Sequence, residues 1–295
     1  METLTRSESG TGVWRMPWKM GALAVLFLLT YAPLYPKLAE TWLEDSNNSH
    51  GLLIPIVSLF LMWEVRTRIK TVKSMPSLIG LGLLAVSLIV YFITYVGGLA
   101  FAARITMITT LAGLILFNSG WTAFKVVLFP VLFLFFMVPV PDTLMNLVAF
   151  PLQLLVSDAS ARLIELYGIP VYAEGNLLFF AQYSFEVTEA CSGIRSLVSY
   201  LAIGALLAYI ARDSWFTSVF LVLSTVPLAL FVNLLRVAGT GVMANYFGTK
   251  VAQGFAHDFS GFVVFGAGIV LMFAELWLLK KIRFNRGVGR KGADS

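Results

Sequence analysis

The sequence has little charge for its length. Only 13% of its 295 residues are charged, whereas 58% are hydrophobic. A soluble globular domain carries about 25% charged residues and about 45–50% apolar ones. A water-soluble fold could not cover this much apolar surface, so the excess must face lipid. The composition therefore excludes soluble enzymes and soluble binding modules.

Cysteine and histidine are also scarce. The chain contains one cysteine, Cys191, and two histidines, His50 and His257. A single cysteine cannot form an intrachain disulfide, and these three residues do not have the spacing of zinc ligands. We therefore expect no metal site and no metal or organic cofactor.

The excess of positive charge is small and is spread over short segments. The chain has 21 basic and 16 acidic residues, which gives a net charge of +5. The Lys and Arg residues lie between apolar runs, where they act as signals of membrane topology. No basic run with interleaved aromatic residues is present, so we expect no nucleic-acid partner. The lipid bilayer is the expected surrounding.

Long apolar runs occupy most of the chain. A helix that spans a bilayer needs about 20 mostly apolar residues. We predict an all-α membrane protein with about eight transmembrane helices, of which the second is short for a span. Their approximate limits are Trp18–Pro36, His50–Val65, Ser77–Val96, Leu99–Phe117, Trp121–Val138, Gly193–Ile210, Trp215–Leu235 and Phe259–Leu279.

The positions of Lys and Arg predict the orientation, because cytoplasmic loops carry an excess of both. If both termini are cytoplasmic, most of the 21 basic residues fall inside. The external ones are Lys37, Arg104, Arg162, Arg195, Arg236 and Lys250. We predict a single polytopic domain over residues 1–295, with disordered cytoplasmic tails at 1–16 and 284–295.

The largest external segment covers residues 139–192. Residues 143–156 are apolar but too short to span, and Pro151 interrupts them, so we expect an interfacial or re-entrant helix before the cysteine. Within residues 170–188, the turn sequence Glu174-Gly175-Asn176 separates two apolar runs, the second of which ends in alternating apolar and polar residues. This pattern predicts a small β-hairpin on the extracytoplasmic face.

Four residues with reactive side chains fall at the extracytoplasmic ends of the predicted spans. Cys191 lies just before the sixth span, and Arg236 ends the seventh. His257 precedes the eighth span, and His50 opens the second. These residues are far apart in the sequence, yet the predicted topology places all of them at one membrane face.

Acyl transfer can use this set of side chains. The pKa of a thiol falls at a helix N-terminus and beside a cation, and Cys191 has the start of a span and Arg195 close by. A histidine can act as general acid or base, and Arg236 can stabilise an oxyanion. Asn233 precedes Arg236 by three residues on the same helix face, so it can orient the guanidinium.

Each of these residues also has a purely structural interpretation. A lone cysteine in a membrane protein is most often a small buried hydrophobe. A histidine at a span end often anchors the helix at the interface, and Arg236 could cap its span by snorkelling. Arg104 lies inside the fourth predicted span, where an ionisable group must form a pair or line a cavity.

The motifs around these residues resemble those of the exosortases, the bacterial branch of the exosortase/archaeosortase superfamily. The resemblance runs from about Trp42 to about Leu279, and the cysteine motif is its most specific part. The matching pieces are Ser49-His50-Gly51, Val138-Pro139-Val140-Pro141, Gly168-Ile169-Pro170-Val171, Val187-Thr188-Glu189-Ala190-Cys191-Ser192-Gly193-Ile194-Arg195, Asn233-Leu234-Leu235-Arg236-Val237, and His257 with Gly261.

The resemblance implies a catalytic set formed by Cys191, Arg236 and His257. The residues expected to support this set are Arg195, Asn233, His50, Ser192 and Glu189. His50 remains an alternative to His257 as the acid or base. Archaeal relatives can carry arginine at the position of His257, so its role as a base stays open.

The resemblance also implies an activity and a location. The enzyme would be a thiol protease or transpeptidase of the bacterial inner membrane, with its active site on the periplasmic face. Its substrates would be membrane-anchored proteins with a C-terminal PEP-CTERM signal, which it would transfer to an unknown surface acceptor, often alongside exopolysaccharide production. The alternatives are a transporter or flippase, a non-catalytic component of exopolysaccharide export, and a peptidase that only hydrolyses.

Overall fold

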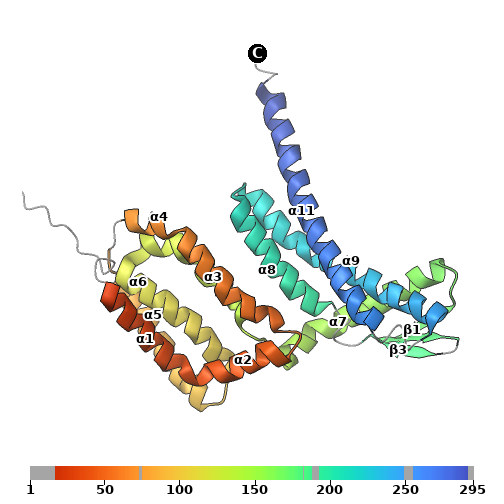
Figure 1. Cartoon of the computed structure of the whole chain (residues 1–295), viewed down its shortest axis with the longest axis horizontal. Coiled ribbons are helices and arrows are strands. Elements are labelled where there is room, and N and C mark those ends of the chain that lie inside the picture. The colour runs from red at the N-terminus through yellow and green to blue at the C-terminus, as the bar shows by residue number, and fades with distance from the viewer. Residues whose placement is uncertain (1–16, 73–74, 182, 188–192, 249–254, 292–295) are drawn as a thin grey trace, which may run out of the picture. The chain divides into compact units, whose positions relative to one another are not determined.

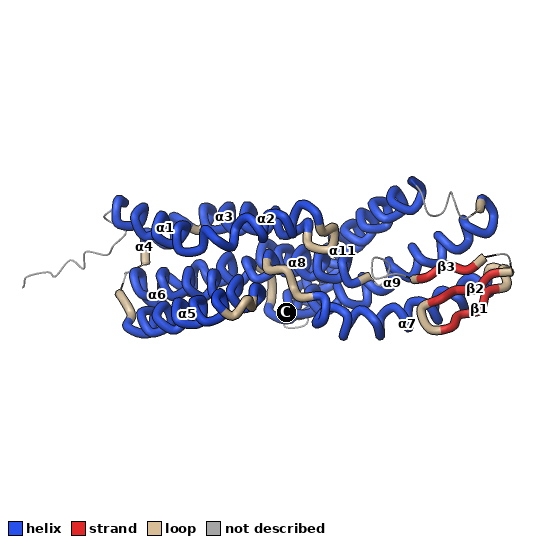
Figure 2. Tube along the Cα trace, turned by 90° about the horizontal axis from the view of Figure 1, so that it is seen from below, coloured by secondary structure: helices blue, strands red, loops and turns tan. Residues whose placement is uncertain are grey.

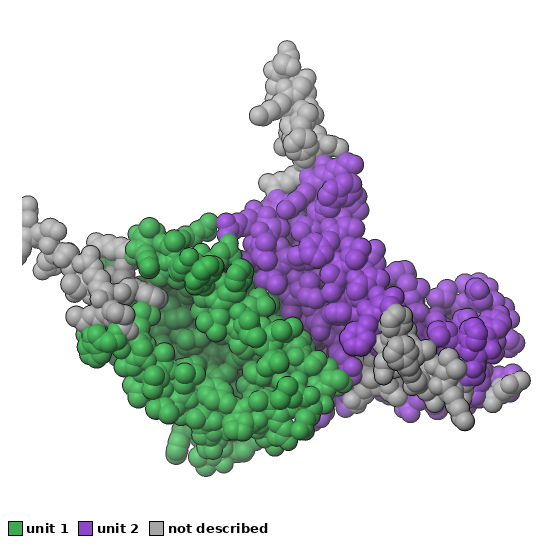
Figure 3. Space-filling view, in the orientation of Figure 1, with its two compact units in different colours: residues 1–141 green, residues 142–295 purple. Residues whose placement is uncertain are grey.

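The chain packs as two compact units. The computed structural model describes residues 17–72, 75–181, 183–187, 193–248 and 255–291. The first unit ends at Pro141 and the second begins at Asp142 (Figure 3). The expectation of a single polytopic domain stays a prediction.

All regular elements of the first unit in the described residues are helices (Figure 1). Its elements are α1 (Pro17–Tyr31), the 3-10 helix η2 (Ala32–Leu34), α2 (Tyr35–Glu44), η3 (Ser49–Leu52), α3 (Leu53–Glu64), α4 (Arg66–Thr71), α5 (Leu78–Val96), α6 (Ala100–Phe133) and η4 (Leu134–Met137).

The second unit combines helices with one small sheet. Its elements are α7 (Asp142–Leu166), β1 (Val171–Glu174), β2 (Leu177–Phe180), β3 (Ser184–Glu186), α8 (Ile194–Ala211), α9 (Trp215–Phe247) and α11 (Phe255–Lys291). Helix α11 continues to Lys291 through most of the C-terminal tail that was expected to be disordered, and residues 1–16 lie outside the described residues.

Seven helices in the described part of the chain are long and apolar enough to cross a membrane, which confirms an all-α membrane protein. They are Trp18–Glu44, Leu78–Val96, Ala100–Met137, Asp142–Leu166, Ile194–Ala211, Trp215–Phe247 and Gly261–Ile282. The expected count was about eight, and the two counts differ at three places in the chain. The predicted second span is a shorter apolar helix, Ser49–Glu64.

The second difference lies in α6, which joins the predicted fourth and fifth spans. Gly120 breaks this helix, with a φ of 77° that favours glycine. A Cβ at this position would lie 1.9 Å from the carbonyl oxygen of Met75. The break therefore falls where the sequence predicts the end of one span and the start of the next.

The third difference lies in α7. Residues 143–156, which were expected to form a short interfacial helix, belong to a continuous helix of 25 residues. Pro151 lies inside this helix and does not end it. Proline removes one backbone hydrogen bond and usually kinks a helix, but neighbouring packing can hold such a helix together.

Small residues let α5 and α6 pack closely. A Cβ at Gly80 would lie 2.2 Å from the backbone nitrogen of Phe117, and one at Gly113 would lie 2.9 Å from that of Leu84. The hydroxyl of Ser87 donates a hydrogen bond to Thr109 across the same contact, at 2.8 Å. As the residue number rises along α5 in these three contacts, the number of the partner in α6 falls. Helix α5 and the first half of α6 are therefore antiparallel neighbours.

The predicted hairpin is present and has a third strand. Strand β1 pairs antiparallel with β2, and β2 pairs antiparallel with β3. Glu174 faces Leu177 across a two-residue turn in which Gly175 has a φ of 62°, as a tight hairpin turn requires. Figure 2 shows the three strands side by side within the second unit.

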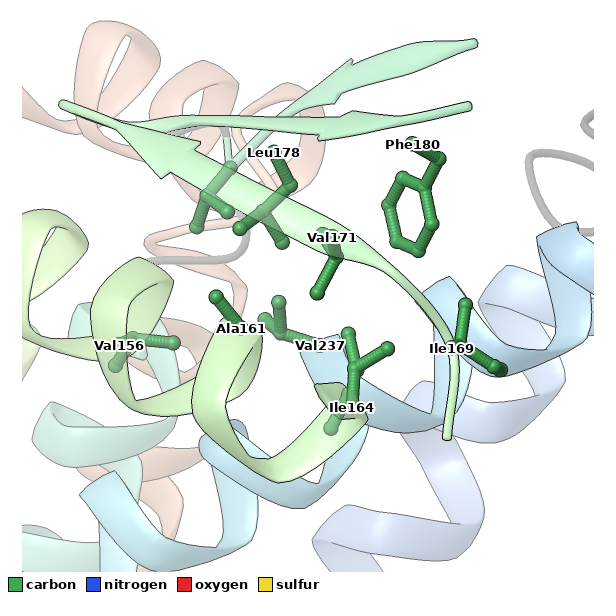
Figure 4. Close-up of a cluster of buried hydrophobic side chains, with 10 residues drawn as sticks. Val156, Ala161, Ile164, Ile169, Val171, Leu178, Phe180 and Val237 are labelled. Carbon is green, nitrogen blue, oxygen red and sulfur yellow. The ribbon is translucent and has the colours of Figure 1, made fainter. Parts of the chain in front are cut away.

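The sheet packs on α7 and α9 through a cluster of buried side chains (Figure 4). The cluster contains Val156, Ala161, Ile164, Ile169, Val171, Leu178, Phe180, Val187, Val237 and Ala238. A second cluster joins α8, α9 and α11, where the Tyr200 hydroxyl donates to the carbonyl oxygen of Phe265 at 3.0 Å. Helix α9 belongs to both clusters and therefore holds the second unit together.

The packing of α5 on α6 can be tested with two glycines of the same helix. Replacing Gly80 with alanine forces the backbones of α5 and α6 apart. This change should lower the free energy of unfolding by roughly 1–3 kcal/mol. The same change at Gly82, which has no neighbour within 4 Å, should be neutral or slightly stabilising. Thermal unfolding of the full chain in detergent measures both effects, and equal midpoints for the two variants would contradict the packing.

Candidate active site

The start of α8 is pressed against α9. Gly193 precedes the first residue of α8 with a φ of 81°, and its carbonyl accepts a hydrogen bond from the amide of Leu197 at 2.8 Å. A Cβ on Gly193 would lie 3.1 Å from the Cβ and Cγ of Asn233. Asn233 is only 2% exposed. Glycine is needed here both for the backbone conformation and for the close approach of Asn233.

The chain on the other side of residues 188–192 is fixed on the same helix. Val187 is fully buried in the cluster that contains Val237 of α9. The Tyr183 hydroxyl donates to the carbonyl oxygen of Gly241 at 3.1 Å, and burial raises the pKa of this hydroxyl, which keeps it a neutral donor. The two ends of the cysteine motif that the structure describes therefore both contact α9, between residues 233 and 241.

Helix α11 approaches α9 at Arg236. A Cβ on Gly261 would lie 3.8 Å from Cζ and Nε of Arg236, so the guanidinium group lies against the α11 backbone. His257 belongs to the first turn of α11 and precedes Gly261 by four residues, which is about one helical turn. Arg236 itself is half-buried.

The structure describes some of the predicted site residues and leaves others out. Cys191, Ser192 and Glu189 lie outside the described residues, as does the side chain of His257. Arg195 is half-buried in the first turn of α8, where the partial positive charge of the helix N-terminus adds to its own charge. Of the residues expected to support catalysis in the second unit, Arg195 and Asn233 are thus described.

His50 belongs to the first unit, in a tightly packed group of its own. Burial lowers the pKa of its imidazole, although hydrogen bonds to the backbone of Phe136 and Asn47 favour the charged form. Next to it, Gly51 lies against the Trp42 ring, whose Nε1 donates to the carbonyl oxygen of Met137 at 2.9 Å. The Ser49-His50-Gly51 motif thus packs against the helix that leads into Val138-Pro139-Val140-Pro141.

Two side chains of α9 can stabilise a negative charge in the proposed site. Among residues 17–72, 75–181, 183–187, 193–248 and the described part of α11, no group of three or more His, Cys, Asp or Glu side chains could hold an ion. The buried amide of Asn233 and the guanidinium of Arg236 lie one turn apart on α9. Such groups can bind the negative charge that develops on an oxyanion.

The fold defines a polytopic helical membrane protein, and comparison with known proteins identifies its family. Residues 42–274 match the family described as transmembrane exosortase (Exosortase_EpsH). The chain therefore belongs to the exosortase family. No curated protein and no solved structure matches the chain.

Two glycines test the contact between α8 and α9. Replacing Gly193 or Gly168 with alanine places a side chain at a left-handed backbone position, which costs roughly 1–2 kcal/mol in either case. Gly168 has open space around it, whereas alanine at 193 must also displace Asn233. We expect the thermal midpoint of Gly193→Ala to lie several degrees below that of Gly168→Ala. Coinciding midpoints would show that the contact has no energetic weight.

Proposed function

We propose that this exosortase is a membrane-embedded cysteine transpeptidase with Cys191, Arg236 and His257 as its catalytic residues. One observation carries the proposal: α9 contacts both the start of α8 and the start of α11. Gly193, two residues after Cys191, packs on Asn233. Gly261, one turn after His257, packs on Arg236.

The chemistry of the proposed reaction is an acyl transfer through a thioester. The Cys191 thiolate attacks the scissile carbonyl, and the Sγ–C bond forms while the carbonyl electron pair moves onto oxygen. The Arg236 guanidinium stabilises this oxyanion, with Asn233 fixing its position. His257 gives a proton to the leaving amine as the C–N bond breaks. The nucleophile of an acceptor then attacks the thioester, returns a proton to His257 and releases the thiolate.

The proposed substrates are membrane-anchored proteins with a C-terminal PEP-CTERM signal. The apolar helix of such a signal can enter the bilayer beside the chain, which brings the short motif before it to the membrane surface. With the eight spans predicted from the sequence, the excess of Lys and Arg in the cytoplasmic loops favours cytoplasmic termini and a periplasmic active site in the bacterial inner membrane. Membership of the exosortase family favours this enzyme over a transporter or a passive export component.

Mass spectrometry of a reporter substrate tests the thioester route. With wild-type enzyme, a reporter that ends in a PEP-CTERM signal should be shortened and should carry an adduct at its new C-terminus. Cys191→Ala should leave it full length, because no other group supplies the attacking sulfur. Arg162→Gln is the matched control, since Arg162 is an exposed cation that pairs with Asp158 on α7 at 2.9 Å. Processing by Cys191→Ala would refute the proposal, and a free carboxylate in place of the adduct would show hydrolysis.

The two histidines are separated by their expected effects on rate and on stability. His257→Gln should slow reporter processing by about 10²–10⁴-fold, the usual contribution of a general acid or base. His50→Gln removes hydrogen bonds to the backbone of Phe136 and Asn47, so it should lower stability by about 1–3 kcal/mol. Rates are compared per amount of folded protein. A large loss of rate in folded His50→Gln, with normal His257→Gln, would transfer the acid role to His50.

A further inference from the structure

The first unit contains a buried positive charge that the proposed reaction does not use. Arg104, in the second turn of α6, is only 8% exposed. Within the part of the chain that the structure describes, no hydrogen bond or ion pair engages its guanidinium group. An uncompensated charge is costly away from water, and in a membrane segment it indicates a functional site.

Arg104 lines a cavity of about 260 Å³. A second cation, Lys37 of α2, lines the same cavity and is itself exposed. The wall also includes Thr94 and Tyr95, which bring polar side chains to it, and none of the described lining residues is acidic. Both cations are among the few that fall on the predicted extracytoplasmic side. Their mutual repulsion calls for a negative ligand.

The start of α6 adds to this positive field. Ala100 and Ala103, in its first turn, line the cavity. The amide of Ala103 donates to the carbonyl oxygen of Leu99 at 3.0 Å, and Gly98, with a φ of 70°, turns the chain from α5 into α6. The N-terminus of a long helix carries about half a positive charge, and anions bind there.

We propose that this cavity binds the phosphate group of an anionic ligand on the extracytoplasmic side. The Arg104 guanidinium donates two parallel hydrogen bonds to phosphate oxygens, and Lys37 adds its charge at the exposed rim. Two cations and a helix N-terminus balance the negative charge of a phosphate group and offer hydrogen-bond donors to its oxygens. Because Pro33 and Leu34 also line the cavity, a lipid headgroup can bring its phosphate to the same residues as a soluble phosphate ester. The proposal does not depend on the catalytic roles of Cys191, Arg236 or His257.

Titration of the full-length, delipidated protein in detergent tests the site. The ligands are dihexanoyl phosphatidic acid, inorganic phosphate and, as an uncharged reference, dihexanoylglycerol. Arg104→Gln should weaken binding of phosphatidic acid about 10- to 100-fold, as expected for the loss of charge-assisted hydrogen bonds. Arg104→Lys keeps the positive charge but loses the two parallel hydrogen bonds of the guanidinium group. Its affinity for phosphatidic acid should therefore lie between those of the wild type and Arg104→Gln. Lys37→Gln should weaken binding about 2- to 5-fold, because its ammonium is exposed.

Arg162→Gln serves as the control and should bind as the wild type does. Because Lys37 is exposed, Lys37→Gln keeps the test valid if Arg104→Gln does not fold. Tighter binding of phosphatidic acid than of inorganic phosphate identifies a lipid headgroup site, and comparable binding identifies a site for soluble phosphate esters. The proposal is overturned if dihexanoylglycerol binds as tightly as phosphatidic acid, or if Lys37→Gln and Arg104→Lys both retain the wild-type affinity.

Discussion

The packing of α9 against its neighbours is the constraint on which the second unit depends. Residues 233–241 of this helix contact the start of α8, the sheet and the start of α11. Gly193 makes the first of these approaches possible, because a Cβ there would lie only 3.1 Å from Asn233, whereas a Cβ at Gly261 would lie in ordinary contact with Arg236 at 3.8 Å. In a membrane, where lipid is as apolar as any side chain, such close backbone contact is a main source of helix association. A site assembled from these elements therefore requires α9 in place.

Much of the fold follows from local patterns in the sequence. Apolar runs separated by short polar segments predict the helices, and the turn sequence Glu174-Gly175-Asn176 predicts the hairpin, whose register the structure gives. The break at Gly120 also falls where two apolar runs meet. The continuity of α7 through Pro151 could not be predicted in this way, because a proline within a short apolar run usually marks an end. Its neighbours are distant in the sequence, and the cluster around Val156 and Ile164 packs this helix against the sheet and α9.

The sequence predicts the residue types of the candidate site but not the contacts of the residues around it. The cysteine motif, the Asn-x-x-Arg motif and the last histidine point to one membrane face by topology alone. The approach of Gly193 to Asn233, and that of Gly261 to Arg236, join residues that are 40 and 25 positions apart in the chain. No periodicity carries such information, and the only signal in the sequence is a glycine two residues after Cys191 and another four residues after His257. Lys37 had no motif around it, and only the folded first unit brings it to the cavity of Arg104.

The burial of one side of its guanidinium group also determines which way Arg236 can act. The Nε atom of Arg236 is buried, and a Cβ at Gly261 of α11 would lie in ordinary van der Waals contact with it, so α11 lies close to this side of the guanidinium group. Water is excluded from that side, so the charge is screened less there than a charge surrounded by solvent. A helix wall of low dielectric constant confines the field of the guanidinium and directs it to its uncovered side. A cover on one side of a single cation thereby orients an electrostatic field.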